Sequence, residues 1–498
     1  MEGVGRQRLG WTWILYPILL FVAMSAWALS SPPGSSPDED FHLVSAWCGL
    51  GDREGLCAPG AATVTRVVPL DLLRSPCFAF EPTISGNCPT YPGQTEETYR
   101  GNFTGYYPSG FYSVMGLFAG PSLESAVLSM RLVNSAVYAL GLAALLFLAR
   151  PSARAGYMLG SLITLVPLGL FSVASINPSS WAITSATLVW AGAVEFARAK
   201  KLSTRVALAA LTALSLGLGV ASRSDAAAYG ALAIGLAWLA AVKLGRRTLI
   251  FGAIAAAVLG AILVGSLSLG SFQFIGKVPP LTPDDEAGGL FRRLKDLPNL
   301  YAGSFGTRGL GWLDTTMPWV TWILAGSVFA LAIFWGLRRC GWRKAVSLLV
   351  IAVVAAAVPI TLATMRHATV LAVLQPRYFL PVLILAAMIA VSEDNLEGPQ
   401  LNLAQSLVII ASLSMAHAGA LHANLRRYLT GSEVQEFDLN AGMEWWWKVW
   451  SPSPMVVFGI GAIAFLGAVI VVTFNSGTRA DFLPAGEQAE PRRALGSD

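Results

Sequence analysis

The chain has 498 residues, of which 54% are hydrophobic and only 13% are charged, and its formal net charge is +5. Soluble domains carry about 25% charged residues, so this composition excludes an ordinary soluble protein and predicts a membrane protein. The positive charge does not indicate a nucleic-acid partner, because Lys and Arg gather at the ends of apolar segments, where they orient a protein in the bilayer.

Apolar segments of the length that a bilayer requires, about 20 residues, recur along the chain. They lie at 11–30, 122–149, 155–174, 181–198, 205–222, 226–243, 248–270, 318–337, 345–364, 378–392, 404–424 and 454–474. We therefore predict an all-α polytopic membrane protein with about 12 transmembrane helices within residues 1–474. Residues 475–498 are polar and predict a disordered cytoplasmic tail.

The basic residues predict the orientation of these helices. Arg6 and Arg8 precede the first span, and further Lys and Arg residues fall in alternate loops, so both termini are expected in the cytoplasm. The long loops at 31–121, 271–317 and 425–453 are then extracytoplasmic. The stretch Ala26-Trp27-Ala28 resembles a signal-peptidase site, so cleavage of the first span is the alternative to a retained anchor.

Four of the five cysteines lie in the first outer loop, namely Cys48, Cys57, Cys77 and Cys88. In an oxidising compartment they predict two disulfides, and three pairings are open. A zinc site is the weaker alternative, because the four cysteines form no Cys-x-x-Cys pair.

The first outer loop opens with a cluster of carboxylates, Ser35-Ser-Pro-Asp-Glu-Asp-Phe-His42. Asp38, Glu39 and His42 lie just beyond the first span, where a carboxylate can take a proton from a hydroxyl or help to hold a metal. The alternatives are solvated loop residues and, for Asp38, a helix N-cap.

Polar residues within or beside other spans form the second set of candidates. Charges inside a membrane are costly unless they are paired or line a wet cavity, so they indicate function. Arginine suits a lipid phosphate because its guanidinium binds in a bidentate manner. The candidate substrate-binding residues are Arg131, Asn177, Arg223, Arg366, His367, Arg377 and Tyr378. Snorkelling or anchoring at the interface is the alternative for Arg131, Arg377 and Tyr378, and an ion pair with Asp225 is the alternative for Arg223.

Four segments, in order, resemble the DUF2142 family of bacterial polytopic membrane proteins. The first is the carboxylate cluster, which is similar to that family's Pro-Asp-Glu-Pro-x-His signature. The others are Tyr107-Pro-Ser-Gly-Phe-Tyr112, Ser175-Ile-Asn-Pro-Ser-Ser180 and Gln375-Pro-Arg-Tyr-Phe-Leu-Pro381. The sequence departs from the family pattern at Asp40, Ser179 and Pro376.

The resemblance implies a fold and activity like those of GT-C glycosyltransferases. These take a sugar from a polyprenyl-phosphate carrier at the outer face of the bacterial plasma membrane and pass it to a glycan or lipid acceptor of the cell envelope. It implies that Asp38 is the catalytic base, that Glu39 and His42 assist it, and that Arg377 binds the carrier phosphate. No cofactor follows from the residues; a divalent cation, Mg²⁺ or Mn²⁺, is the open alternative, and the metal ligands stay unassigned.

Two other classes of function are consistent with the sequence. A transporter or flippase of a lipid-linked or small solute would place charges at the membrane midplane, often in repeated halves. A non-catalytic scaffold for envelope assembly would use the disulfide-rich loop for docking. Motifs for nucleotide-driven transport, serine hydrolases and zinc proteases do not occur in the sequence.

Overall fold

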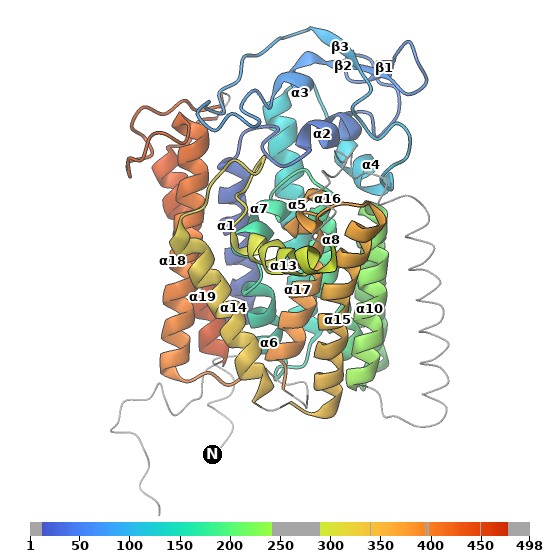
Figure 1. Ribbon diagram of the computed structural model, residues 1–498, viewed down its shortest axis with the longest axis vertical. Helices are drawn as coiled ribbons and strands as arrows, with labels where there is room; N and C mark the ends of the chain where they lie inside the picture. The colour runs from blue at the N-terminus through green and yellow to red at the C-terminus, as the bar shows by residue number, and fades with distance from the viewer. Residues whose placement is uncertain are drawn as a thin grey trace, which may run out of the picture.

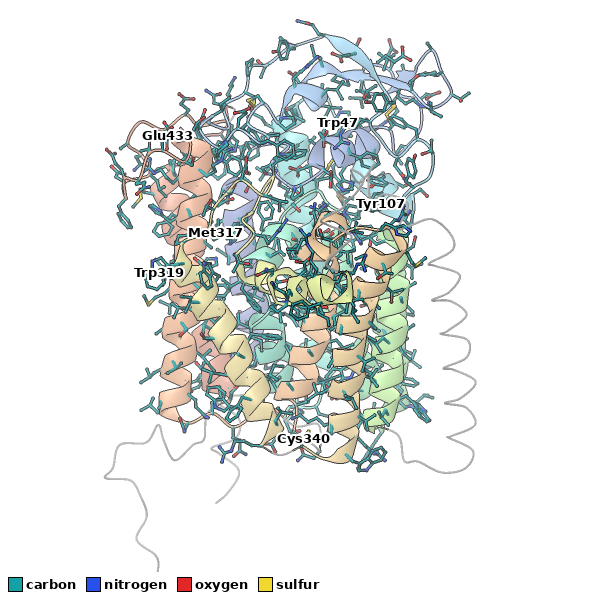
Figure 2. The ribbon with its side chains drawn as sticks, in the orientation of Figure 1. Trp47, Tyr107, Met317, Trp319, Cys340 and Glu433 are labelled. Carbon is teal, nitrogen blue, oxygen red and sulfur yellow. A yellow bond between two sulfur atoms is a disulfide. The ribbon has the colours of Figure 1, made fainter. Side chains whose placement is uncertain are left out.

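The computed structural model describes residues 12–241, 289–338, 340–393, 395, 398–448 and 450–476. Two layers build the molecule: an upright bundle of helices and, at one end of it, a cap formed mostly by the first long loop (Figure 1). Trp47 and Tyr107 lie at the cap end, and Cys340 lies at the opposite end (Figure 2).

The bundle is made of long apolar helices and several shorter ones. They are η1 (Thr12–Ile14), α1 (Leu15–Leu29), α5 (Leu123–Leu148), α6 (Arg154–Leu162), α7 (Leu168–Val173), α8 (Ser179–Arg198), α9 (Leu202–Ser222), α10 (Ser224–Ala241), α14 (Trp319–Leu337), α15 (Trp342–Met365), α17 (Pro376–Val391), α18 (Leu403–Thr430) and α19 (Pro454–Ser476).

Within the described residues, eight helical segments are long and apolar enough to cross a membrane. They correspond to the predicted spans that begin near 11, 122, 205, 226, 318, 345, 404 and 454. The prediction of about twelve spans is therefore not confirmed. The predicted span at 248–270 and the predicted tail after Ser476 lie outside the described residues.

Three predicted spans take a different form because each is shorter or more polar than a single spanning helix. The segment 155–174 is broken into α6 and α7, and Pro167, at the start of α7, lacks the N–H that would continue a helix. At 16 residues, α17 is shorter than the bilayer requires. Although α8 has 20 residues, it carries Glu195 and several hydroxyl side chains. It is enclosed by α5, α9, α10 and α17, so neighbouring helices rather than lipid surround these polar groups.

The first long loop, at 31–121, folds into a cap that contains regular structure. Its elements are α2 (Glu39–Trp47), β1 (Ala58–Pro59), β2 (Arg66–Pro69), α3 (Leu70–Arg74), β3 (Thr95–Thr98) and α4 (Gly110–Gly116). The strands form an antiparallel sheet in the order β1-β2-β3, so the fold is not wholly helical. Disulfides join Cys48 to Cys57 and Cys77 to Cys88, so each cysteine pairs with its neighbour in sequence.

Two connections between the long helices contain shorter helices, of which α16 borders the site described below. Helix α13 (Gly289–Ala302) lies across the bundle, and η2 (Gly303–Phe305) follows it (Figure 1). Helix α16 (Val370–Val373) connects α15 to α17. Asp296 of α13 accepts a hydrogen bond from the backbone N–H of Val370 at 3.2 Å, which attaches α13 to α16.

Candidate active site

The turn that joins α1 to α2 is held from beneath by one buried arginine of α5. Arg131 has no exposed surface, and its Nη1 donates hydrogen bonds to the carbonyl oxygens of Ala28, at 3.0 Å, and Ser31. Its Nη2 donates to the carbonyl oxygen of Pro32 at 2.8 Å. These carbonyls lie in the last turn of α1 or just beyond it, where intrahelical donors are missing, so Arg131 supplies the donors that the turn needs.

Glu39 completes this arrangement, and we name Glu39 with Arg131 the closed cluster. Glu39 is fully buried and lies 3.0 Å from Arg131 Nη2. Its carboxylate also accepts hydrogen bonds from the backbone N–H groups of Ser36, at 3.1 Å, and Ile176, at 3.0 Å. Because protein groups surround both side chains, the catalytic role predicted for Glu39 and the substrate role predicted for Arg131 are replaced by structural roles.

Asp38, one residue earlier, faces the other way. Its backbone adopts the left-handed conformation, with φ 60° and ψ 18°, which Asp tolerates better than most residues. Asp38 stands at the N-cap position of α2, as the alternative interpretation expected, but its side chain makes no capping hydrogen bond. Instead one carboxylate oxygen accepts a hydrogen bond from Arg377 Nη2 at 2.8 Å, and the other lies 3.5 Å from Arg100 Nη2. We name Asp38, Arg377 and Arg100 the open cluster.

The peptide before Asp38 is fixed by residues of two of the other segments that resemble the family. The carbonyl oxygen of Pro37 accepts hydrogen bonds from Asn177 Nδ2 at 3.2 Å and from Arg377 Nη1 at 3.4 Å. Asn177 Oδ1 in turn accepts one from the backbone N–H of Ser179 at 2.9 Å. Asn177 therefore positions the backbone at Asp38, although the sequence predicted a contact with substrate.

Access and charge single out Asp38 within the open cluster. Its side chain is 44% exposed, whereas that of Arg377 is 5% exposed. Burial acts to raise the pKa of Asp38, but Arg377, His42 and Arg100 act in the opposite direction and bring the pKa below its ordinary value. Asp38 is therefore a carboxylate at neutral pH.

His42 lies on α2, one turn beyond Asp38, and is almost completely buried. Its Nδ1 is 2.9 Å from the hydroxyl oxygen of Tyr112, and its ring stacks on the Tyr112 ring. Burial lowers the pKa of His42 to about 3, against the opposing effect of Asp38. The imidazole is therefore neutral at physiological pH and does not act as a cationic helper there.

Asp38 opens into a cavity of about 510 Å³ between the cap and the bundle. A cavity of this size can accept a ligand of several rings. Its lining combines charged, aromatic and aliphatic side chains: Asp38, Phe41, His42, Arg100, Tyr106, Tyr107, Arg223, Ser224, Asp225, Arg308, Leu313, Leu371, Ala372, Val373, Leu374, Gln375 and Tyr378.

Arg223 and Tyr378, both predicted from the sequence, come together in the lining of this cavity. Arg223 pairs with Asp225 at 2.6 Å, as the alternative interpretation of this residue expected. The Arg223 guanidinium also lies over the Tyr378 ring, 4.5 Å from its centroid. Arg377 Nη2 donates to the Tyr378 hydroxyl at 3.2 Å, so Tyr378 joins the two arginines.

Arg308 and Arg100 are functional candidates that the sequence interpretation missed. Arg308 lies in the glycine-rich connection after η2, is partly exposed, and has no ion-pair or hydrogen-bond partner among the residues that the structure describes. Arg100, from the loop after β3, is 43% exposed on its side chain and pairs with Asp40. In the sequence, each of these residues is simply an arginine in a polar loop, which does not by itself indicate a functional site.

Arg366 and His367, predicted as substrate ligands, do not line the cavity. Both lie in the turn that follows α15 and are exposed to solvent. His367 also has a positive φ of 49°, which places it in a tight turn before α16. Their nearness to Arg377 in sequence does not bring them to Asp38, because α16 intervenes.

A resident metal ion has no ligand set among the described residues, which contain no group of three or more His, Cys, Asp or Glu side chains that could hold one. Asp38 pairs with arginines, whose positive charge opposes the binding of a cation at the same oxygens. The arrangement instead combines an accessible carboxylate with several guanidinium groups, which suits proton transfer beside an anionic leaving group.

The apolar helices and this capped cavity define a multi-pass membrane protein. Residues 19–386, well over half of the chain, match the model of the family described as predicted membrane protein DUF2142, and the chain belongs to that family. No curated protein and no solved structure gives a significant match.

Proposed function

We propose that this protein is a GT-C type glycosyltransferase of the bacterial plasma membrane. It would move a sugar from a polyprenyl-phosphate donor to a cell-envelope acceptor on the extracytoplasmic face. The observation that carries the proposal is Asp38, an accessible carboxylate held at the wall of a 510 Å³ cavity that three arginines also line.

The chemistry needs a proton acceptor beside the acceptor hydroxyl. As the anomeric carbon leaves the phosphate oxygen and bonds to the acceptor oxygen, the hydroxyl proton passes to Asp38. The donor leaves as a polyprenyl phosphate that keeps the electron pair of the broken bond. Arg377 holds the carboxylate in place, and it keeps Asp38 ionised and ready to accept a proton.

The leaving phosphate carries negative charge and needs cations rather than a general acid. The sequence favoured Arg377 for this role, but its Nη2 already binds Asp38 and Tyr378, and Arg377 does not line the large cavity. Arg308 faces the large cavity with no partner among the described residues. We therefore assign the phosphate to Arg308, with Arg223 beside it on the Tyr378 ring.

The test is the transfer of radiolabelled sugar from a panel of polyprenyl-phosphate donors, with purified wild type beside Asp38→Asn. Asparagine also tolerates the left-handed conformation, so this change removes the charge and keeps the backbone. We expect kcat to fall by about 10²- to 10⁴-fold, the usual contribution of a general base.

Asp52→Asn is the matched control, because Asp52 is an exposed carboxylate of the same cap and does not line the cavity. It should retain most of the wild-type rate. Equal transfer by wild type and Asp38→Asn would show that another residue is the catalytic base. Failure of wild type with every donor would favour the transporter or scaffold.

A further inference from the structure

The cavity beside Asp38 has two unlike walls. One comes from the cap and presents Asp38, Arg100 and Tyr106, with further aromatic residues behind them. The other comes from the chain around α16 and is aliphatic, with Leu371, Ala372, Val373 and Leu374 in sequence. We name these the cap wall and the α16 wall.

The cap wall combines an aromatic face with hydrogen-bonding groups of both signs. Tyr106 is 45% exposed, similar to the side chains of Asp38 and Arg100, so each of the three keeps part of its surface exposed at the cavity. Behind them Phe41 and Tyr107 pack with ring centroids 6.0 Å apart, and the His42 ring lies 5.4 Å from that of Tyr107. This packing gives the wall a rigid base.

The α16 wall is supported by a helix with an exposed apolar surface. Arg293 Nε of α13 donates to the carbonyl oxygen of Ala368 at 3.3 Å, just before α16. Leu290, Phe291 and Leu294 of the same helix are exposed. An aliphatic wall favours a hydrocarbon chain over a sugar.

We propose that the cap wall is the acceptor site and that it takes a water-soluble glycan, whose ring packs on Tyr106 and whose hydroxyls bind Asp38 and Arg100. This inference rests on the proposed glycosyltransferase function and chooses between its glycan and lipid acceptors. The donor lipid then lies along the α16 wall, with its phosphate at Arg308.

The chemistry of a sugar ring matches this wall. The C–H face of a pyranose is apolar and packs on an aromatic ring, whereas its edge carries hydroxyls that donate to a carboxylate and accept from a guanidinium. The same wall holds the base, so a hydroxyl that binds there is already next to Asp38. A lipid acceptor would instead have to place its chain against charged groups, which is unfavourable.

The first measurement is saturation-transfer NMR on the full chain in detergent micelles, with a panel of di- to tetrasaccharides as probes. We expect signals from ring protons with wild type, an affinity about tenfold lower with Tyr106→Ala, and near-wild-type binding with Tyr106→Phe. Tyr99→Ala is the matched control, because Tyr99 belongs to the same cap, is 81% exposed and does not line the cavity. Equal binding by Tyr106→Ala and wild type overturns the proposal, as does a lack of binding to every probe.

The second measurement separates this inference from the proposed function. Tyr106→Ala should raise the KM for the glycan acceptor and leave the KM for the lipid donor unchanged, whereas Leu371→Ser should do the reverse. Transfer to lipid acceptors alone would overturn the glycan site while keeping the glycosyltransferase. Glycan binding without transfer from any donor would instead overturn the enzymatic function.

Discussion

Asp38 and Glu39 are adjacent carboxylates with opposite surroundings. In the closed cluster, Glu39 is fully buried against Arg131 and accepts two backbone hydrogen bonds. In the open cluster, Asp38 meets Arg377 and Arg100 but keeps nearly half of its side chain exposed to the cavity. The left-handed backbone at Asp38 lies at the point where the two side chains diverge. A carboxylate that holds a turn and one that can react thus occupy neighbouring positions.

The largest expected effect on folding comes from Glu39→Gln. This change leaves the buried charge of Arg131 uncompensated, which costs about 3–5 kcal/mol of stability. We expect a large fall in melting temperature and in the yield of folded protein, measured in detergent by tryptophan fluorescence. Glu54→Gln, which changes an exposed carboxylate of the cap, is the matched control and should melt close to wild type. If Glu39→Gln is stable but inactive, Glu39 has a catalytic role rather than the structural role assigned to it here.

A somewhat smaller effect is expected from Arg308→Ala, which leaves the two clusters intact. A hydrogen bond to a charged group contributes about 1.5–3 kcal/mol, so the KM for the polyprenyl-phosphate donor should rise about 10- to 100-fold. Arg366→Ala removes the same charge from an exposed turn outside the cavity and should leave the KM unchanged. A raised KM with Arg366→Ala and an unchanged KM with Arg308→Ala would instead support phosphate binding by the residues that the sequence favoured. Steady-state kinetics with varied donor decide between them.

His42 links the open cluster to the stability of the cap. Because its pKa is about 3 when folded and about 6.5 when unfolded, the unfolded state takes up a proton first as the pH falls. This contribution to stability is fully present above pH 6.5, and about 2 kcal/mol of it is lost by pH 5. His42→Gln, which does not titrate, should weaken the dependence of the melting temperature on pH between 7 and 5. An unaltered dependence would show that His42 has the same pKa in the folded and unfolded states, and would contradict the burial described here.

The smallest expected effect is that of pH on catalysis. Asp38 must be deprotonated to accept a proton, and its pKa lies below its ordinary value, so kcat/KM should be level from pH 5 to pH 8. The rate should fall only at more acidic pH, as Asp38 becomes protonated. An acidic limb centred between pH 6 and pH 7 would contradict the environment described for Asp38 and identify a different base.

Several features of this protein follow from its sequence because they depend on local composition. Eight spans, the position of the carboxylate cluster after the first of them, and membership of the family are all visible along the chain. Hydropathy sums over neighbouring residues, so it detects long uniform helices. It overestimates the number of spanning helices where an apolar segment breaks at Pro167, or where a helix ends after 16 residues, as α17 does.

Only the tertiary structure distinguishes Asp38 from Glu39, because their partners are distant in sequence. Arg131 and Arg377 lie about 90 and 340 residues away from them, and no local pattern shows which carboxylate each arginine reaches. The sequence also does not single out Arg308, because it is a functional candidate only through the cavity that it lines together with residues of the cap and α16. The sequence by itself determined that this is a membrane protein with a carboxylate cluster beyond its first span. Long-range packing decided which carboxylate is buried and which stays open, because burial depends on the neighbours that folding brings together.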